Sequence, residues 1–161
     1  MPSACNGTNI MNKKILLVSL AISSVSLIAC QQNKAQTEPM TPTITVKEMM
    51  TGVFEPVSNA LWAVALDENI PQTDEDWKAL ENQSIQLLTV SAALSLGGSG
   101  PKDIAWTQDE RWQQHLQQMV EIGNGFLAAS RDKNYQGLLD AGEVLIEPCG
   151  NCHTDFPGDS E

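Results

Sequence analysis

The chain has 161 residues, and its nine Lys and Arg residues are outnumbered by twenty Asp and Glu, which gives a formal net charge of −11 at pH 7. An acidic surface of this kind repels nucleic acid and anionic lipid headgroups, so we expect no nucleic-acid partner. It favours a protein partner with a basic docking surface, although acidity also serves simply to keep a protein soluble. The length suffices for one domain with one hydrophobic core.

Residues 11–29 have the organisation of an export signal. They include two lysines near their start and continue as an apolar stretch that is too short for a comfortable transmembrane helix. The stretch ends in Leu-Ile-Ala-Cys at residues 27–30, which resembles the lipobox of bacterial lipoproteins. Cys30 is therefore predicted to carry a lipid anchor, and a secretory signal with a chance cysteine is the alternative. Residues 1–10 precede this complete signal, and we interpret them as a spurious N-terminal extension.

Residues 30–44 are predicted to link the lipid to the folded part of the protein. After Cys30 they are polar, contain Pro and Thr, and show no apolar period, which indicates a flexible tether. A lipidated signal of this kind predicts a location on the periplasmic side of a bacterial membrane. Gln31 stands where an aspartate commonly retains lipoproteins in the inner membrane, so we favour the outer membrane over the inner one.

Residues 45–157 carry the periodicity of four amphipathic helices. Apolar residues recur every three or four positions in four stretches, over about 45–67, 73–94, 107–127 and from 134 onward. No strand-like alternation of useful length appears, and the joints between the stretches are short. The pattern predicts an all-α domain, folded as an antiparallel up-down-up-down four-helix bundle and followed by a tail at 158–161.

Local signals mark where these helices begin, end or bend. Pro56 lies within the first helix, so a kink or a local opening is expected there. Thr73, followed by three acidic residues, marks the start of the second helix, and the Gly-rich residues 97–101 end it. Pro148 removes one hydrogen bond from the fourth helix and favours a bend in it.

The sequence Cys149-Gly150-Asn151-Cys152-His153 lies near the C-terminus. In an exported protein this C-x-x-C-H pattern is typical of a c-type haem attachment site, where two thiols bond to the porphyrin and the histidine binds the iron. A disulfide, a redox pair and half a zinc site are the alternatives. Zinc requires two further soft ligands, and a thioredoxin-like pair requires a βαβ setting. We therefore predict one haem c, covalently attached at Cys149 and Cys152, with His153 as an axial iron ligand.

The predicted topology indicates which residues face this motif. In an antiparallel bundle the start of the first helix lies at the same end as the motif. Met50 is on the apolar stripe of that helix and is a candidate distal iron ligand, while Met49 flanks the stripe and is a less favoured one. Val53 is an apolar residue that would close the distal side of the haem pocket instead.

Several other large side chains are candidates for the pocket or the core. Trp106 and Trp112 are predicted walls of the haem pocket, although core packing explains both more simply. Trp62 and Trp77 fall at the opposite end of the predicted bundle, where we expect core packing and no cofactor role. His115 is a third and least favoured candidate for the distal iron ligand. It lies among glutamines beside an apolar helix face, so we expect it at a solvent-facing or partly buried edge.

The chain resembles the class II cytochromes c, the group that contains cytochrome c prime. The resemblance covers residues 45–156 and rests on four helical stretches that end in C-x-x-C-H, among them the segments VKEMMTGVFEPVSNALW, SAALSLGG and LLDAGEVLIEPCGNCH. It implies the bundle fold, covalent haem at the two cysteines of the motif, and the motif histidine as the fifth iron ligand. Phe156 keeps an aromatic residue that many members have, but Pro157 stands where they have a basic one.

Three functions remain open from the sequence. Ligation by Met50 or Met49 predicts an electron carrier, because methionine fills the sixth iron position in many electron-transfer cytochromes. Closure by Val53 predicts a five-coordinate haem protein that binds NO or CO, as in cytochrome c prime, and a haem-free C-x-x-C lipoprotein is the remote alternative. No Ser/His/Asp arrangement or phosphate-binding loop is apparent, so we expect no enzyme. The expected partner is a redox protein, and a homodimer stays open.

Overall fold

The computed structural model describes residues 41–158. The predicted N-terminal extension, the signal and Cys30 therefore lie outside the described residues, as does most of the tether. Every regular element in the described part of the chain is helical and none is a strand, which confirms the predicted all-α class. None of these helices is long and apolar enough to cross a membrane.

The first helical stretch consists of three consecutive segments: α1 (Val46–Met49), the π-helix η1 (Met50–Phe54) and α2 (Glu55–Ala63). It begins where Thr45 and Glu48 form a reciprocal cap. The Glu48 backbone N–H donates to the Thr45 hydroxyl at 3.1 Å, and the Thr45 backbone N–H donates to the Glu48 carboxylate at 2.7 Å. This arrangement satisfies backbone donors that the first turn of a helix otherwise leaves unpaired.

The predicted opening near Pro56 takes the form of the π-helix. Proline has no N–H, and its ring in a regular α-helix clashes with the carbonyl four residues earlier, which here belongs to Gly52. The chain widens directly before the proline, where the Glu55 N–H donates to the carbonyl of Met50 five residues back. One extra residue is thus accommodated in a single turn.

This extra residue changes which side chains reach the core. The buried stripe runs from Met49 to Phe54, a step of five residues, and continues at α-helical spacing through Val57 and Leu61. A regular helix would have carried the stripe through Val53 instead. Val53 is 37% exposed, and Phe54 is the residue that is buried.

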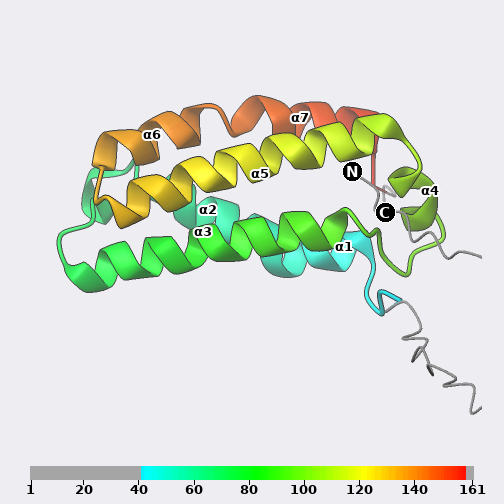
Figure 1. Ribbon diagram of the computed structural model, residues 1–161, viewed down its shortest axis with the longest axis horizontal. Helices are drawn as coiled ribbons and strands as arrows, with labels where there is room; N and C mark the ends of the chain where they lie inside the picture. The colour runs from blue at the N-terminus through cyan, green and yellow to red at the C-terminus, as the bar shows by residue number, and fades with distance from the viewer. Residues whose placement is uncertain (1–40, 159–161) are drawn as a thin grey trace, which may run out of the picture. The chain divides into compact units, whose positions relative to one another are not determined.

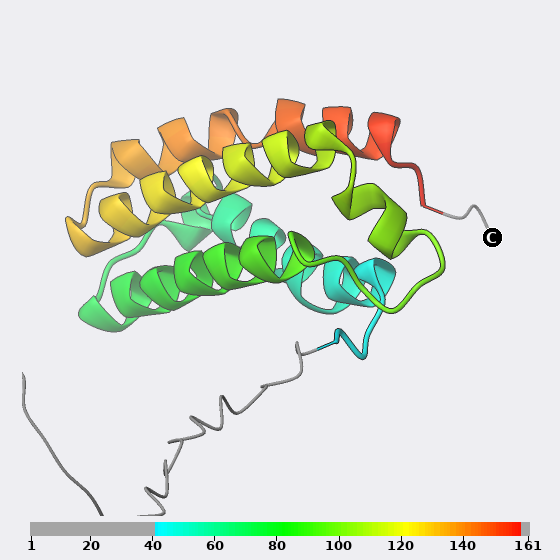
Figure 2. The ribbon, with the colours of Figure 1, turned by 45° about the vertical axis from the view of Figure 1, so that its right-hand side comes forward.

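Helices α3 (Asp74–Leu94) and α5 (Glu110–Arg131) form the most extensive contact in the described domain and run antiparallel (Figures 1 and 2). The indole N–H of Trp112 donates to the carbonyl of Leu94 at 3.0 Å, near the start of α5 and the end of α3. Near the opposite ends, Arg131 Nε donates to Glu81 Oε1 at 3.0 Å. The start of α3 is capped by Thr73 as predicted.

The joint between α3 and α5 contains the short helix α4 (Asp103–Thr107) and is tied to the start of α1. The carboxylate of Asp103 is buried and accepts hydrogen bonds from the backbone N–H of Val46 at 2.9 Å and of Gly100 at 2.8 Å. A Cβ atom at Gly98 would collide with the Asp103 carboxylate and with the Val46 nitrogen, so only glycine fits there.

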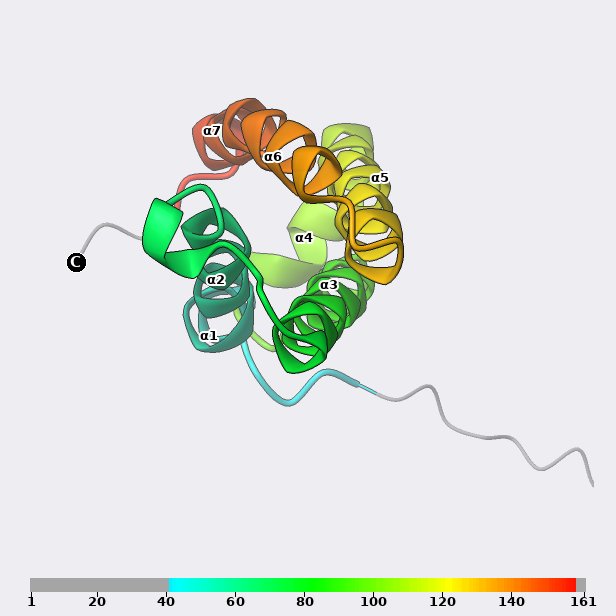
Figure 3. The ribbon, with the colours of Figure 1, turned by 90° about the vertical axis from the view of Figure 1, so that its left-hand side faces the viewer.

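The fourth predicted helix is interrupted and forms α6 (Tyr135–Glu143) and α7 (Ile146–Asp155), which follow one another along α5 (Figures 1 and 3). Asn134 caps the start of α6, where the sequence predicted the helix to begin. The break falls four residues before Pro148, whose ring would clash with the carbonyl of Val144 in a continuous helix. Pro148 itself lies in the first turn of α7, where proline is tolerated.

Side chains from every long helical stretch meet in one core. α2 is linked to α3 by the short 3₁₀ turn η2 (Asp67–Asn69), and the view along the helices shows α2, α3, α5 and α6 surrounding the centre (Figure 3). The largest side chains that are fully buried are Leu61, Leu87, Leu94, Phe126, Leu138 and Leu145.

The π-helix allows a test by deletion. Removing Gly52 shortens the step from Met49 to Phe54 to four residues, which a regular α-helix accepts without moving the core stripe. A Cβ atom at Gly52 would touch nothing within 4 Å, so no packing depends on this residue. With Pro56→Ala added to avoid a proline in a regular helix, we expect the free energy of unfolding in urea to stay within about 1 kcal/mol of the wild-type value.

Deletion of Asn59 is the matched control for this test. It lies in the regular helix α2, so its removal rotates Val57 away from Leu61 by one residue step. Loss of several core contacts should cost about 3 kcal/mol or more. Equal destabilisation by both deletions would contradict the proposed accommodation of one extra residue in η1.

Candidate haem site

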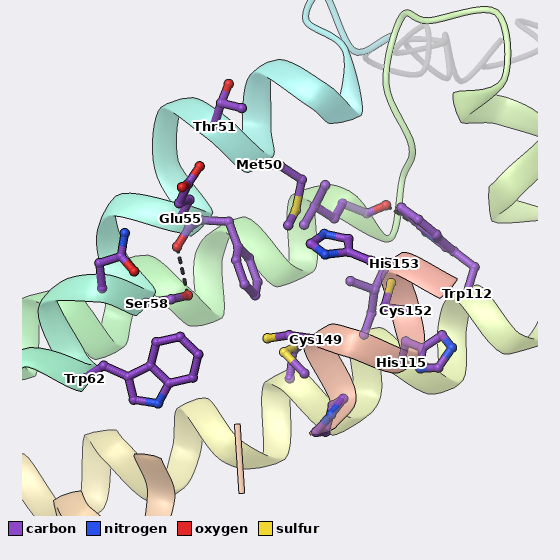
Figure 4. A pocket seen from close by; sticks show the side chains of 16 residues that line it. Met50, Thr51, Glu55, Ser58, Trp62, Trp112, His115, Cys149, Cys152 and His153 are labelled. Atoms are coloured by element: carbon purple, nitrogen blue, oxygen red, sulfur yellow. Dashed lines mark hydrogen bonds between the residues drawn. The ribbon is translucent and has the colours of Figure 1, made fainter. Parts of the chain in front are cut away.

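One cavity lies between η1, α2, α5 and α7, with the end of α3 as part of its wall (Figure 4). Its volume of about 410 Å³ falls within the roughly 300–1,000 Å³ range of small-molecule and cofactor pockets. Apolar and aromatic side chains dominate its lining. The lining residues are Met50, Thr51, Phe54, Glu55, Ser58, Asn59, Trp62, Leu94, Trp112, His115, Leu116, Met119, Pro148, Cys149, Cys152 and His153.

Helix α7 brings the three functional residues of the C-x-x-C-H motif to this cavity. Cys149 and Cys152 are one helical turn apart, so both thiols lie on the same face of α7. Both are half-buried and are not joined by a disulfide. His153 follows directly and also lines the cavity (Figure 4). It is an exposed residue.

The two thiols lie in surroundings that keep them protonated. Burial raises the pKa of Cys149 above its ordinary value. Burial, followed by the neighbouring Cys149 and by Asp155, raises the pKa of Cys152 to about 11. A redox-active C-x-x-C pair has the opposite property, because thiol–disulfide exchange needs a thiolate and hence a lowered pKa. The surroundings therefore differ from those of a thioredoxin-like site.

Met50 is one of three residues of η1 that line the cavity, together with Thr51 and Phe54. The side chains of Met50 and His153 point toward one another across it (Figure 4). Met49, expected only to flank the apolar stripe, is instead buried in the core, 5% exposed, and does not line the cavity. Val53 does not line it either, and Phe54 takes the place expected of Val53, because the π-helix shifts the inward face by one residue.

Two of the tryptophans, Trp62 and Trp106, lie differently with respect to the cavity than the sequence predicted. Trp112 lines the cavity, whereas Trp106 does not and instead stacks on Trp112, with ring centroids 5.5 Å apart. Trp62 was expected far from the site, but it lines the cavity and its indole N–H donates to the carbonyl of Gly142 at 2.9 Å. The sequence contained a signal for it: Met50, Phe54, Ser58 and Trp62 follow at four-residue intervals, and all four line the cavity.

His115 lies at a partly buried edge, as the sequence predicted. Its side chain is 12% exposed and lines the cavity, and its Nε2 lies 2.9 Å from Oδ2 of Asp155. The other ring nitrogen, Nδ1, is buried and has no hydrogen-bond partner. Neither Asp155 nor this contact was singled out in the sequence.

No protein-family model, curated protein or solved structure matches the chain. The resemblance to class II cytochromes c therefore stays a prediction from the motif and the helical pattern. The features of this chain that bear on its function are the cavity and the residues that α7, η1 and α5 bring to it.

The raised thiol pKa values predict slow alkylation of the folded, haem-free chain. Only the thiolate reacts, so a thiol with a pKa of about 11 instead of 9.0 is about a hundredfold less reactive well below both values. The rate of iodoacetamide addition at Cys152, followed by peptide mass spectrometry at pH 8, should rise by about that factor when the chain is unfolded in urea. Similar rates in the folded and unfolded chain would contradict the assigned surroundings of Cys152.

Proposed function

We propose that this chain is a haem c-binding protein that carries electrons on the periplasmic side of a bacterial membrane. The observation that carries the proposal is that a single cavity is lined by Cys149, Cys152 and His153 from α7 and by Met50 from the facing η1. These are the side chains that covalent attachment and axial ligation of a haem on both faces require.

The cavity and its donors fit a haem c. The walls are largely apolar, as the two faces of a porphyrin require, and the two thiols are not joined in a disulfide, so both are available for thioether bonds to the haem. A haem held here would supply an iron that alternates between the ferrous and ferric states. Trp112, Phe54 and Leu116 would exclude water from its faces, and their packing would keep the surroundings rigid as the charge of the iron changes.

The two axial positions decide between electron transfer and gas binding. His153 would occupy one position, and Met50, which lines the facing wall of the cavity, would occupy the other. An iron with two protein ligands changes oxidation state with little rearrangement and leaves no position open for NO or CO. The position of Met50 in the cavity lining therefore favours the electron carrier, and the exposure of Val53 disfavours an apolar closure by that residue.

The remaining assignments complete this proposal. An antiparallel arrangement of α1–η1–α2, α3, α5 and α6–α7 is compatible with the four-helix bundle of the class II cytochromes c, which the chain resembles in its motif. We propose that lipidated Cys30 and the tether hold this domain at the membrane, preferably the outer one. The acidic surface would guide a basic redox partner.

Covalent haem is the first requirement of this function. The chain exported to a bacterial periplasm with haem-attachment enzymes should give a positive pyridine haemochrome test and an intact mass that includes one haem. The double change Cys149→Ser and Cys152→Ser should abolish covalent haem, because no thioether can form. Cys30→Ser is the matched control: it should lose the lipid and keep the haem. A wild-type chain without haem would overturn the proposal in favour of a haem-free C-x-x-C lipoprotein.

Met50→Ala tests the sixth ligand. The reduced wild-type protein should show little spectral response to CO, whereas the variant should bind CO and show a lower reduction potential, because thioether ligation favours ferrous iron. Met49→Ala is the control, since it should lower the free energy of unfolding by about 2–5 kcal/mol without a CO response. An immediate CO response of the wild-type protein would instead identify a gas-binding haem protein.

A further inference from the structure

Helix α7 carries the whole C-x-x-C-H motif, yet none of its own residues is fully buried. The residues that flank it are buried: Leu145 precedes the helix with no exposed surface, and Phe156 follows it at 6%. The fully buried contacts therefore lie at the two ends of the helix, whereas Cys149 and Cys152 in its middle are only partly buried against the core and line the cavity. The position of His153 over the cavity therefore depends on the contacts at the C-terminal end of α7, where Asp155 lies two residues further along the chain.

Asp155 makes the polar contacts at this end. Its Oδ1 accepts a hydrogen bond from Arg111 Nη1 at 2.9 Å, and its Oδ2 lies 2.9 Å from His115 Nε2. An ionised carboxylate only accepts, so the hydrogen of the second contact belongs to His115. Arg111 and His115 are four residues apart on α5 and hence on one helix face, so each can bind one of the two carboxylate oxygens.

Further contacts fix Arg111 and the residue that follows Asp155. Arg111 is held in place by Asp109, the cap of α5, with Nη2 at 2.7 Å from Oδ2. Its guanidinium lies 5.5 Å from the ring centroid of Phe156. Phe156 also meets Trp112 edge to face at a centroid distance of 5.1 Å. Both donors of the carboxylate thus come from a part of α5 that is itself well anchored.

We propose that Asp155 is a positioning residue for His153: together with Arg111 and His115 it forms a clamp that fixes the last turn of α7 on α5. This inference rests on the proposed function, in which His153 binds iron. The clamp sets how far α7 stands from the cavity and how the imidazole is turned toward it. The clamp also assigns a role to His115, which lines the cavity and whose Nδ1 has no hydrogen-bond partner.

The clamp has a local effect that differs from general stabilisation. Asp155 and Arg111 are 30% and 54% exposed, and ion pairs of this exposure contribute little to global stability. Their effect is to restrict the end of one helix that has no buried side chain. Loss of the carboxylate therefore should free the last turn of α7 while the packing of α3 against α5 is kept.

The test compares Asp155→Ala with Glu81→Ala in the full chain. Glu81 is the matched control, because it also pairs with an arginine of α5, Arg131, but near the opposite end of that helix. In haem-free protein, the hydrogen-exchange rate of the Phe156 amide, which donates to the carbonyl of Cys152 at 2.8 Å, should rise by about tenfold in Asp155→Ala. It should not change in Glu81→Ala.

In haem-loaded protein, Asp155→Ala should shift the reduction potential and the axial-ligand spectrum at a temperature where both variants are fully folded. Glu81→Ala should leave both at the wild-type values. Unchanged exchange at Phe156 and an unchanged spectrum in Asp155→Ala would overturn the clamp even if wild-type protein holds haem. Absence of haem from wild-type protein would instead overturn the proposed function, and the exchange measurement separates the two failures.

Discussion

The packing of α3 against α5 is the contact on which the other elements depend. These two long helices share the most extensive interface of the described domain, and fully buried residues of both, such as Leu87 and Phe126, form the centre of the core. The hydrogen bond from Trp112 to Leu94 joins them at the cavity end. The remaining stretches attach to this pair, and the cavity lies where η1 and α7 face one another across it. The first helical stretch packs on α3, and α6 and α7 pack on α5. The cavity forms where these outer stretches do not contact one another.

Signals confined to a few neighbouring residues were sufficient to predict most of the fold. Thr73 caps α3 and Asn134 caps α6 at the places that the sequence indicated, because a cap is decided by the residues beside it. The π-helix could not be placed in the same way. Pro56 indicates that the regular α-helix is interrupted. Whether the chain kinks or takes up an extra residue depends on which register packs better against α3. That choice decides between Val53 and Phe54, and sequence periodicity alone favoured the wrong residue.

The candidate site shows the same division between local and distant information. The motif at Cys149 could be recognised in the sequence because its three functional residues lie within five consecutive positions of one helix. The contacts of Trp62 with Gly142 and of His115 with Asp155 join residues that are 80 and 40 positions apart, so no local pattern records them. His115 was placed correctly at an edge of the apolar face, but its partner could be found only once α5 and α7 were side by side.

The way in which α7 is held leaves room for a cavity of about 410 Å³ beneath it. A helix that buried its own side chains would fill the interior and leave no room for a cofactor, whereas α7 is anchored through Leu145, Phe156 and Asp155 at its ends. Apolar walls that face a cavity lose the dispersion contacts that a filled core would provide. A bound group that filled the cavity would restore these contacts and so stabilise the folded state. If the proposed haem fills the cavity, its retention and the stability of this end of the bundle would be coupled through α7, the helix that carries Cys149, Cys152 and His153.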